Sequence, residues 1–181
     1  TFTMYGGSIN NNKAPNGSGG AISVENGTIN THGGEMNGNS AINGGAIHLK
    51  DNTEGEICNI KADSNAATRT GGAIYTETSG IIKFRDIELS KNRANLGGGI
   101  YLRFAANDIH AHIDNANIHD NSASGNGGGI YLDGNKCSNP ATNINCSNIC
   151  NNISGSDGGG VFAGPGTMLN LRDGSVSNNT C

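Results

Sequence analysis

Pairs of glycines, each followed closely by a short apolar segment, recur six times along the chain. Apolar and polar residues alternate in these segments, as at Ile47/Leu49 and Ile100/Leu102, and side chains two positions apart lie on one face of a β-strand. The leading apolar residues are spaced by 25, 27, 26, 30 and 31 positions, and they are Ile22, Ile47, Ile74, Ile100, Ile130 and Val161. The pattern predicts six short strands, each entered through a glycine turn.

An asparagine recurs with the same period, spaced by 27, 26, 27, 29, 31 and 27 positions, at Asn12, Asn39, Asn65, Asn92, Asn121, Asn152 and Asn179. In most copies apolar residues precede it by three, eight and ten positions, as Leu89, Phe84 and Ile82 precede Asn92. Two independent marks thus share one period, and each copy contains three short strands separated by turns. No stretch of the chain has the 3.6-residue period of an α-helix.

A unit of about 27 residues with three short strands cannot bury its apolar face alone. Stacking of such units pairs each strand with its equivalent in the next one and aligns equivalent side chains. The sequence therefore predicts an all-β fold, a parallel β-helix of about seven rungs with three strands per rung. The preferred chirality of crossover connections favours the right-handed form.

The two repeated polar marks are expected at the corners of the solenoid. A glycine pair allows the backbone to reverse in little space, because glycine reaches positive φ at low cost. The repeated asparagine is expected at the preceding corner, where its amide bonds the turn backbone and its copies in adjacent rungs, forming an asparagine ladder. The alternative is an ordinary solvated turn asparagine.

Composition excludes several classes of protein. The 181 residues include 30 Gly and only 3 Pro, with 14% charged residues and a net charge of −4. Low charge and few prolines are unlike a disordered chain, and the absence of Lys/Arg clusters argues against nucleic-acid binding. No apolar run approaches the roughly 18 residues of a membrane-spanning helix. Many tight turns joined by short strands fit this composition.

The glycine and asparagine motifs resemble the repeats of the chlamydial polymorphic outer membrane proteins, whose motifs are GGAI and FxxN. The first motif stands here at residues 19–22, 44–47 and 71–74, and the second as Ile9-x-x-Asn12 and Leu89-x-x-Asn92, with no copy having Phe. The opening TFTMYGGSINNN also looks like repeats in surface proteins of anaerobes. The resemblance implies a right-handed β-helix displayed on a cell surface as an adhesin or autotransporter passenger, and it implies no reaction.

The best cluster of catalytic or metal-binding side chains is NDIHAHIDN. With Ile109, Ala111 and Ile113 facing inward, the four polar residues of one strand face outward, namely Asp108, His110, His112 and Asp114. Two histidines and two aspartates in this pattern are either a metal site or an ordinary solvated strand face. The adjacent rungs add Lys83, Arg85 and Asn145, which bring few further ligands. We expect no catalytic, cofactor-binding or metal site.

The outward position of the strands after the glycines is aromatic in most copies. It is occupied by Ser23 and then by His48, Tyr75, Tyr101, Tyr131 and Phe162, which are expected to stack as one exposed aromatic ladder. Such a ladder stabilises strand pairing, or it is a contact surface for sugars or another protein. It is the candidate interaction face of the chain.

The five cysteines suggest an oxidising exterior. Cys137, Cys146, Cys150 and Cys181 are the candidates for a disulfide, whereas the rung register places Cys58 three rungs from the others, too far for a bond. Cys58 is therefore expected to be free or bonded to another molecule.

The chain begins inside a rung and ends just after the last asparagine, so residues 1–181 are expected to be one uncapped β-helix domain of a longer protein or a polymer. We predict a non-catalytic extracellular cell-surface protein that binds a host or neighbour surface protein, a glycan or its own copies. One alternative is a disulfide-linked filament or sheath subunit stacked end to end. The other is a carbohydrate-active enzyme.

Overall fold

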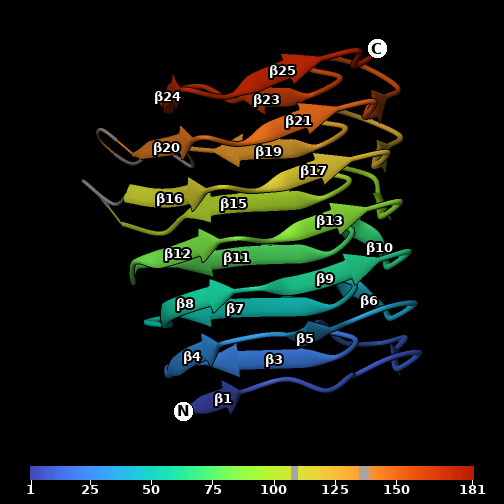
Figure 1. Ribbon diagram of the computed structural model, residues 1–181, viewed down its shortest axis with the longest axis vertical. Helices are drawn as coiled ribbons and strands as arrows, with labels where there is room; N and C mark the ends of the chain where they lie inside the picture. Colours follow the sequence, from blue (N-terminus) through green and yellow to red (C-terminus); the bar gives the residue numbers. More distant parts are fainter. Residues whose placement is uncertain (107–109, 135–137, 139) are drawn as a thin grey trace.

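A computed structural model describes residues 1–106, 110–134, 138 and 140–181. Within these residues the chain is an all-β solenoid without helices, and Figure 1 shows its rungs stacked from the N-terminus at the bottom to the C-terminus at the top. All strand pairings are parallel and join each strand to its equivalent one rung away. The predicted parallel β-helix is confirmed, with about six full rungs.

The strands form four sheets, which the chain visits in the order A, B, C, D. Sheet A consists of β1 (Phe2–Met4), β4 (Thr28–Thr31), β8 (Glu54–Cys58), β12 (Ile82–Arg85), β16 (His110–Asp114), β20 (Ala141–Asn145) and β24 (Met168–Arg172). Sheet B consists of β5 (Gly34–Glu35), β9 (Ile60–Asp63), β13 (Glu88–Ser90), β17 (Asn117–His119), β21 (Asn148–Cys150) and β25 (Ser175–Ser177).

The other two sheets lie on either side of the glycine pairs. Sheet C consists of β2 (Lys13–Ala14), β6 (Ser40–Asn43), β10 (Ala66–Thr70), β14 (Arg93–Ala94), β18 (Ser122–Ala123) and β22 (Ile153–Ser154). Sheet D consists of β3 (Ile22–Glu25), β7 (Ile47–Asp51), β11 (Ile74–Thr78), β15 (Ile100–Phe104), β19 (Ile130–Asp133) and β23 (Val161–Ala163). Sheets A, B and D are the three predicted strands of each rung, and sheet C is a fourth one, which has only two residues in most rungs.

The core consists of apolar columns that run through the stack. Ile57, Phe84, Ile113 and Ile144 follow one another in sheet A, in the predicted register, and each is fully buried. Burial of each such side chain contributes roughly 1.5–3 kcal/mol. Because every rung buries its apolar face against the next, stability depends on an unbroken register.

The two glycines of each pair are required for different reasons. Gly71 has a φ of 65°, in the left-handed region that side chains rarely adopt. Gly72 has no such φ, but a Cβ there would collide with the Gly98 carbonyl oxygen of the next rung. The first glycine therefore allows the turn, and the second, which has no Cβ, allows adjacent rungs to pack closely against each other.

A second corner precedes the asparagines and turns on a single residue. In all seven rungs the residue just before the asparagine has a positive φ, and these residues are Asn11, Gly38, Ser64, Lys91, Asp120, Asn151 and Asn178. Asn, Asp and Gly tolerate this conformation, whereas it is strained for Lys91. The abundance of Asn and Gly in this chain thus reflects its corners.

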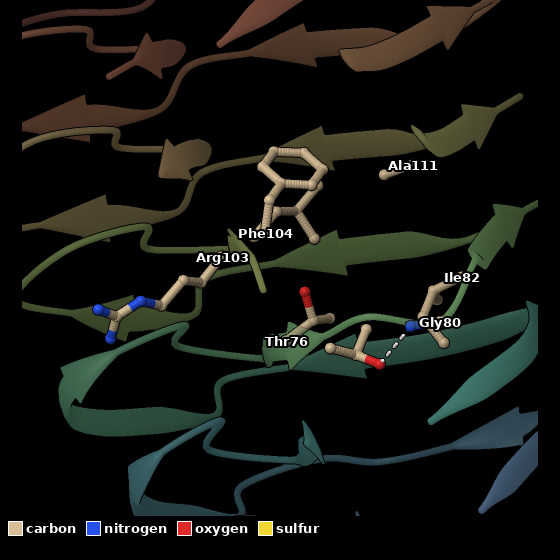
Figure 2. A pocket seen from close by; sticks show the side chains of 8 residues that line it. Thr76, Gly80, Ile82, Arg103, Phe104 and Ala111 are labelled. Carbon is tan, nitrogen blue, oxygen red and sulfur yellow. Dashed lines mark hydrogen bonds between the residues drawn. The ribbon is translucent and has the colours of Figure 1, made fainter. Parts of the chain in front are cut away.

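The interior is closely packed. A void of about 10 Å³ lies among Thr76, Phe104, Ala111 and their neighbours. Figure 2 shows that the Arg103 side chain points away from them. The Gly80 amide donates to the Thr78 hydroxyl beside it at 2.9 Å. A void of this size holds at most one water molecule, so it is not a ligand chamber.

Candidate interaction surface on sheet D

The seven repeated asparagines form a hydrogen-bonded ladder along the whole stack. Each side-chain oxygen after the first accepts both the backbone N–H and the side-chain amide of the asparagine one rung earlier, at 2.9–3.1 Å. The other amide hydrogen donates to a backbone carbonyl of the preceding rung, for example from Asn92 to Ala62 at 2.9 Å.

The five middle members of this asparagine ladder have no exposed surface, and they are Asn39, Asn65, Asn92, Asn121 and Asn152. A solvated turn asparagine therefore does not describe them. Because burial of an unpaired amide is costly, their complete pairing is what makes a polar column tolerable inside the solenoid. The ladder holds the corner between sheets B and C.

The aromatic ladder stacks on the outer face of sheet D. Ring centroids are 5.4 Å apart from His48 to Tyr75 and from Tyr75 to Tyr101, and 4.7 and 4.8 Å apart from Tyr101 to Tyr131 and from Tyr131 to Phe162. Below them the Ser23 hydroxyl lies 3.0 Å from the His48 Nδ1 atom. The predicted stacking partners thus meet one another in register.

The expectation that this ladder is exposed is wrong for most of its length. His48, Tyr75 and Tyr101 are only 9%, 6% and 7% exposed, and Tyr131 and Phe162 are half-buried. Each ring covers the faces of its neighbours, and the corner residues Thr70 and Leu96 lie beside Tyr75 and Tyr101. A sugar stacks on a free aromatic face, so the middle of the ladder offers ring edges and hydroxyl groups instead.

The tyrosine hydroxyls are bound to carboxylates. Tyr75 donates to Glu77 at 2.9 Å and Tyr101 donates to Asp133 at 2.7 Å. Burial and the Glu77 carboxylate raise the pKa of Tyr75 to about 12, and burial with Asp133 also raises the pKa of Tyr101. Both hydroxyls therefore stay protonated and keep donating at physiological pH.

A charged ladder runs beside the aromatic one and was missed by the sequence analysis. Signs alternate from rung to rung along Glu25, Lys50, Glu77, Arg103 and Asp133, which occupy equivalent positions of β3, β7, β11, β15 and β19. Neighbours lie within ion-pair distance at Lys50–Glu25 (3.2 Å), Arg103–Glu77 (3.5 Å) and Arg103–Asp133 (3.6 Å). The signal was present in the sequence, three positions after the leading apolar residue of each strand.

A polar cleft lies between this face and the corner formed by sheet C. It has a volume of about 310 Å³, and it is lined by Asn43, Arg69, Thr70, Tyr75, Glu77, Leu96, Tyr101 and Arg103. Its walls thus combine two guanidinium groups, one carboxylate and several hydroxyl and amide groups.

The His/Asp face of sheet A does not form a metal centre among the described residues. His112 lies opposite Lys83 and Asn143, and Asp114 accepts a hydrogen bond from Asn145 at 2.7 Å. Buried Ala111 and Ile113 place these two side chains on the outer face, as expected. Asp108 and Ile109 lie outside the described residues, as does the side chain of His110.

The described cysteines form no disulfide, and Cys58, Cys146, Cys150 and Cys181 are free thiols. A bridge among the last three is therefore not present, and Cys137 lies outside the described residues. Two strands of sheet A, β12 and β16, separate β8 from β20, which confirms that Cys58 lies three rungs from Cys146. Burial raises the pKa of the Cys58 thiol to about 11, so it is a poor nucleophile.

Comparison with known proteins identifies one similarity. Over 95 residues, or 52% of this chain, the sequence is 38% identical to a protein described as probable outer membrane protein PmpB of Chlamydia trachomatis. The chain spans 5% of the length of that relative. No family model and no solved structure matches. The chain is thus similar in sequence to a polymorphic outer membrane protein, as its repeated GGAI and asparagine motifs predicted.

Proposed function

We propose that this chain is a non-catalytic, adhesin-like segment of a bacterial cell-surface protein. The observation that carries the proposal is the similarity to an outer membrane protein over half of the chain, on a fold built entirely of stacked repeats. A rigid solenoid presents long side-chain columns at fixed spacing, which suits recognition of an extended partner. Its partner is a surface protein or glycan of a host or neighbouring cell.

The chemistry of the described faces supports binding over catalysis. The acidic residues of sheet D are engaged in pairs along the charged ladder, and the histidine of the aromatic ladder is stacked and nearly buried. General acid–base catalysis needs clustered groups with access to a substrate. No specific observation on the described residues supports the enzyme alternative or the filament alternative.

Two experiments test the proposal. Protease treatment of intact source cells should remove the segment from the cell surface, as followed with an antibody against residues 1–181. Beads coated with the folded chain should adhere to cultured epithelial cells, whereas beads coated with the heat-unfolded chain should not. Retention of the segment inside intact cells, or equal adhesion of both bead types, would contradict the proposal.

A further inference from the structure

Strand β10 contains one residue more than the equivalent segments on either side of it. Ile74 follows Asn65 by nine positions, a spacing shared by the last two rungs, whereas in the rungs directly before and after it Ile47 and Ile100 follow their asparagines by eight. Accordingly, Ala67 pairs with Ala41 but Thr70 pairs with Asn43, so the register shifts between them. Such a β-bulge bends the strand and redirects side chains, and bulges are enriched next to binding sites.

The bulge carries Arg69. Its carbonyl oxygen accepts the backbone amides of both Asn95 and Leu96 at 3.0 Å, which fixes the bulged backbone against the next rung. Its side chain is exposed and lines the polar cleft. Lys50 and Arg103 pair with carboxylates, but among the described residues no carboxylate lies within ion-pair distance of Arg69.

The opposite wall of the cleft is polar and fixed in position. Glu77 accepts the Tyr75 hydroxyl at 2.9 Å and lies 3.5 Å from Arg103, which leaves carboxylate lone pairs for a further donor. Thr70 donates to Asn43 at 2.7 Å at the edge of the cleft. Stacking of the tyrosine rings from both sides holds these groups rigid, so little entropy is lost when a ligand binds.

The charge of the cleft favours an anion. Its Arg103 is already offset by Glu77 and Asp133, whereas its Arg69 has no carboxylate within ion-pair distance among the described residues. A ligand that satisfies both Arg69 and Glu77 needs a carboxylate together with hydroxyl donors. A peptide carboxylate side chain is itself only an acceptor, so a backbone amide would have to donate to Glu77, whereas a sugar acid carries the carboxylate and the hydroxyl donors on one ring.

We propose that the cleft binds a sugar acid, with Arg69 binding its carboxylate and Glu77 and Tyr75 binding its hydroxyl groups. A volume of about 310 Å³ is at the lower end of the range for small-molecule sites and suits a single saccharide unit. This inference rests on the proposed adhesin-like function, since it names the chemical class that the surface recognises.

The test is titration of the full chain with D-glucuronate, followed by ligand-observed NMR, with D-glucose as the neutral analogue. Glucuronate should bind and glucose should bind at least about tenfold more weakly, because charge-assisted hydrogen bonds are the strong ones. Arg69→Gln should weaken glucuronate binding by about tenfold or more. The matched control is Arg93→Gln, an exposed arginine on neighbouring β14 that does not line the cleft, and it should leave binding unchanged.

Two further measurements keep the result interpretable. Tyr75→Phe retains the stacked ring, removes the hydroxyl, and should weaken glucuronate binding several-fold. Equal binding by wild type and Arg69→Gln, or equal binding of glucuronate and glucose, would overturn the proposal. Competition by a glutamate-rich peptide as strong as that by glucuronate would also overturn it, in favour of an acidic peptide.

Bead adhesion separates this inference from the proposed function. Loss of adhesion on Arg69→Gln beads, or upon addition of glucuronate, supports both. If adhesion persists under both conditions, the sugar-acid site is refuted as the adhesive surface while the adhesin-like function stands. If wild-type beads do not adhere at all, the proposed function fails, and the glucuronate titration decides the site by itself.

Discussion

The asparagine ladder and the aromatic ladder lie on either side of the same glycine turn, yet they differ in how strictly they repeat. The first has one residue type in all seven rungs, whereas the second runs from Ser23 through His48 and three tyrosines to Phe162. Inside the solenoid each asparagine side chain accepts two hydrogen bonds through its oxygen and donates two through its amide, as Asn92 does. Only asparagine places these groups at the required positions. Outside, stacking only requires a flat ring, so histidine, tyrosine and phenylalanine all serve.

The largest expected effect comes from breaking the asparagine ladder in its middle. Asn92→Ala leaves the buried backbone N–H and one amide hydrogen of Asn65 without an acceptor. Each unsatisfied buried donor costs about 1–3 kcal/mol, so the free energy of unfolding should fall by about 3–5 kcal/mol. Urea denaturation followed by circular dichroism measures this loss.

The first member of the ladder provides the control for that variant. Asn12 is exposed and only donates along the ladder, so Asn12→Ala should cost about 1 kcal/mol or less. Equal losses for Asn12→Ala and Asn92→Ala would mean that burial does not set the strictness of the repeat.

The aromatic ladder should tolerate a change that keeps the ring. Tyr101→Ala removes a nearly buried ring between Tyr75 and Tyr131 and should cost about 3 kcal/mol. Tyr101→Phe keeps both stacking contacts and loses only the hydrogen bond to Asp133, a loss of about 1–2 kcal/mol. Thermal unfolding of the two variants measures the difference, and equal destabilisation would show that the hydroxyl, not the ring, carries the contribution.

The same comparison explains what could be predicted from the sequence. The register of the core was predictable residue by residue, as for Phe84 between Ile57 and Ile113, because stacking repeats the same environment in every rung. Sheet C was missed because strands such as β14 have only two residues and no apolar pair. Both ladders were located from their period alone.

The candidate site was harder to predict because it depends on how adjacent rungs differ from one another. Burial of Tyr75 and Tyr101 depends on corner residues that no strand pattern places, so the aromatic ladder was wrongly expected to be exposed. The spacing from Asn65 to Ile74 is not unusual in this chain, so the bulge follows only from the shorter spacings of the two adjacent rungs, and its consequence appears only when it is seen beside the cleft. The repeats therefore encode this fold, whereas the cleft arises where two adjacent rungs differ in length.

A smaller effect concerns the one histidine in the aromatic ladder. Burial, and then the nearby Lys50, lowers the pKa of His48 below its usual value near 6.5. The neutral form is thus favoured in the folded state, so His48 contributes stability above about pH 6.5 that is lost as the pH falls through its lowered pKa. His48→Phe should make stability less dependent on pH in this range. Urea midpoints of both proteins at pH 8 and pH 5 test this, and parallel profiles would exclude His48 as the source.

The smallest expected effect is a gain in stability at the corner that leads into the asparagine ladder. Lys91 has a φ of 54°, where a lysine is strained and an asparagine is tolerated, so Lys91→Asn should raise the free energy of unfolding by about 0.5–1 kcal/mol. The variant also removes an exposed ion pair with Asp63 at 3.6 Å, which contributes little. Lys61→Asn removes a similar exposed pair with Glu88 at 3.2 Å from strand β9, where no positive φ is required. A gain for Lys91→Asn with none for Lys61→Asn in urea denaturation would assign the strain to the corner, whereas equal changes would assign the effect to charge.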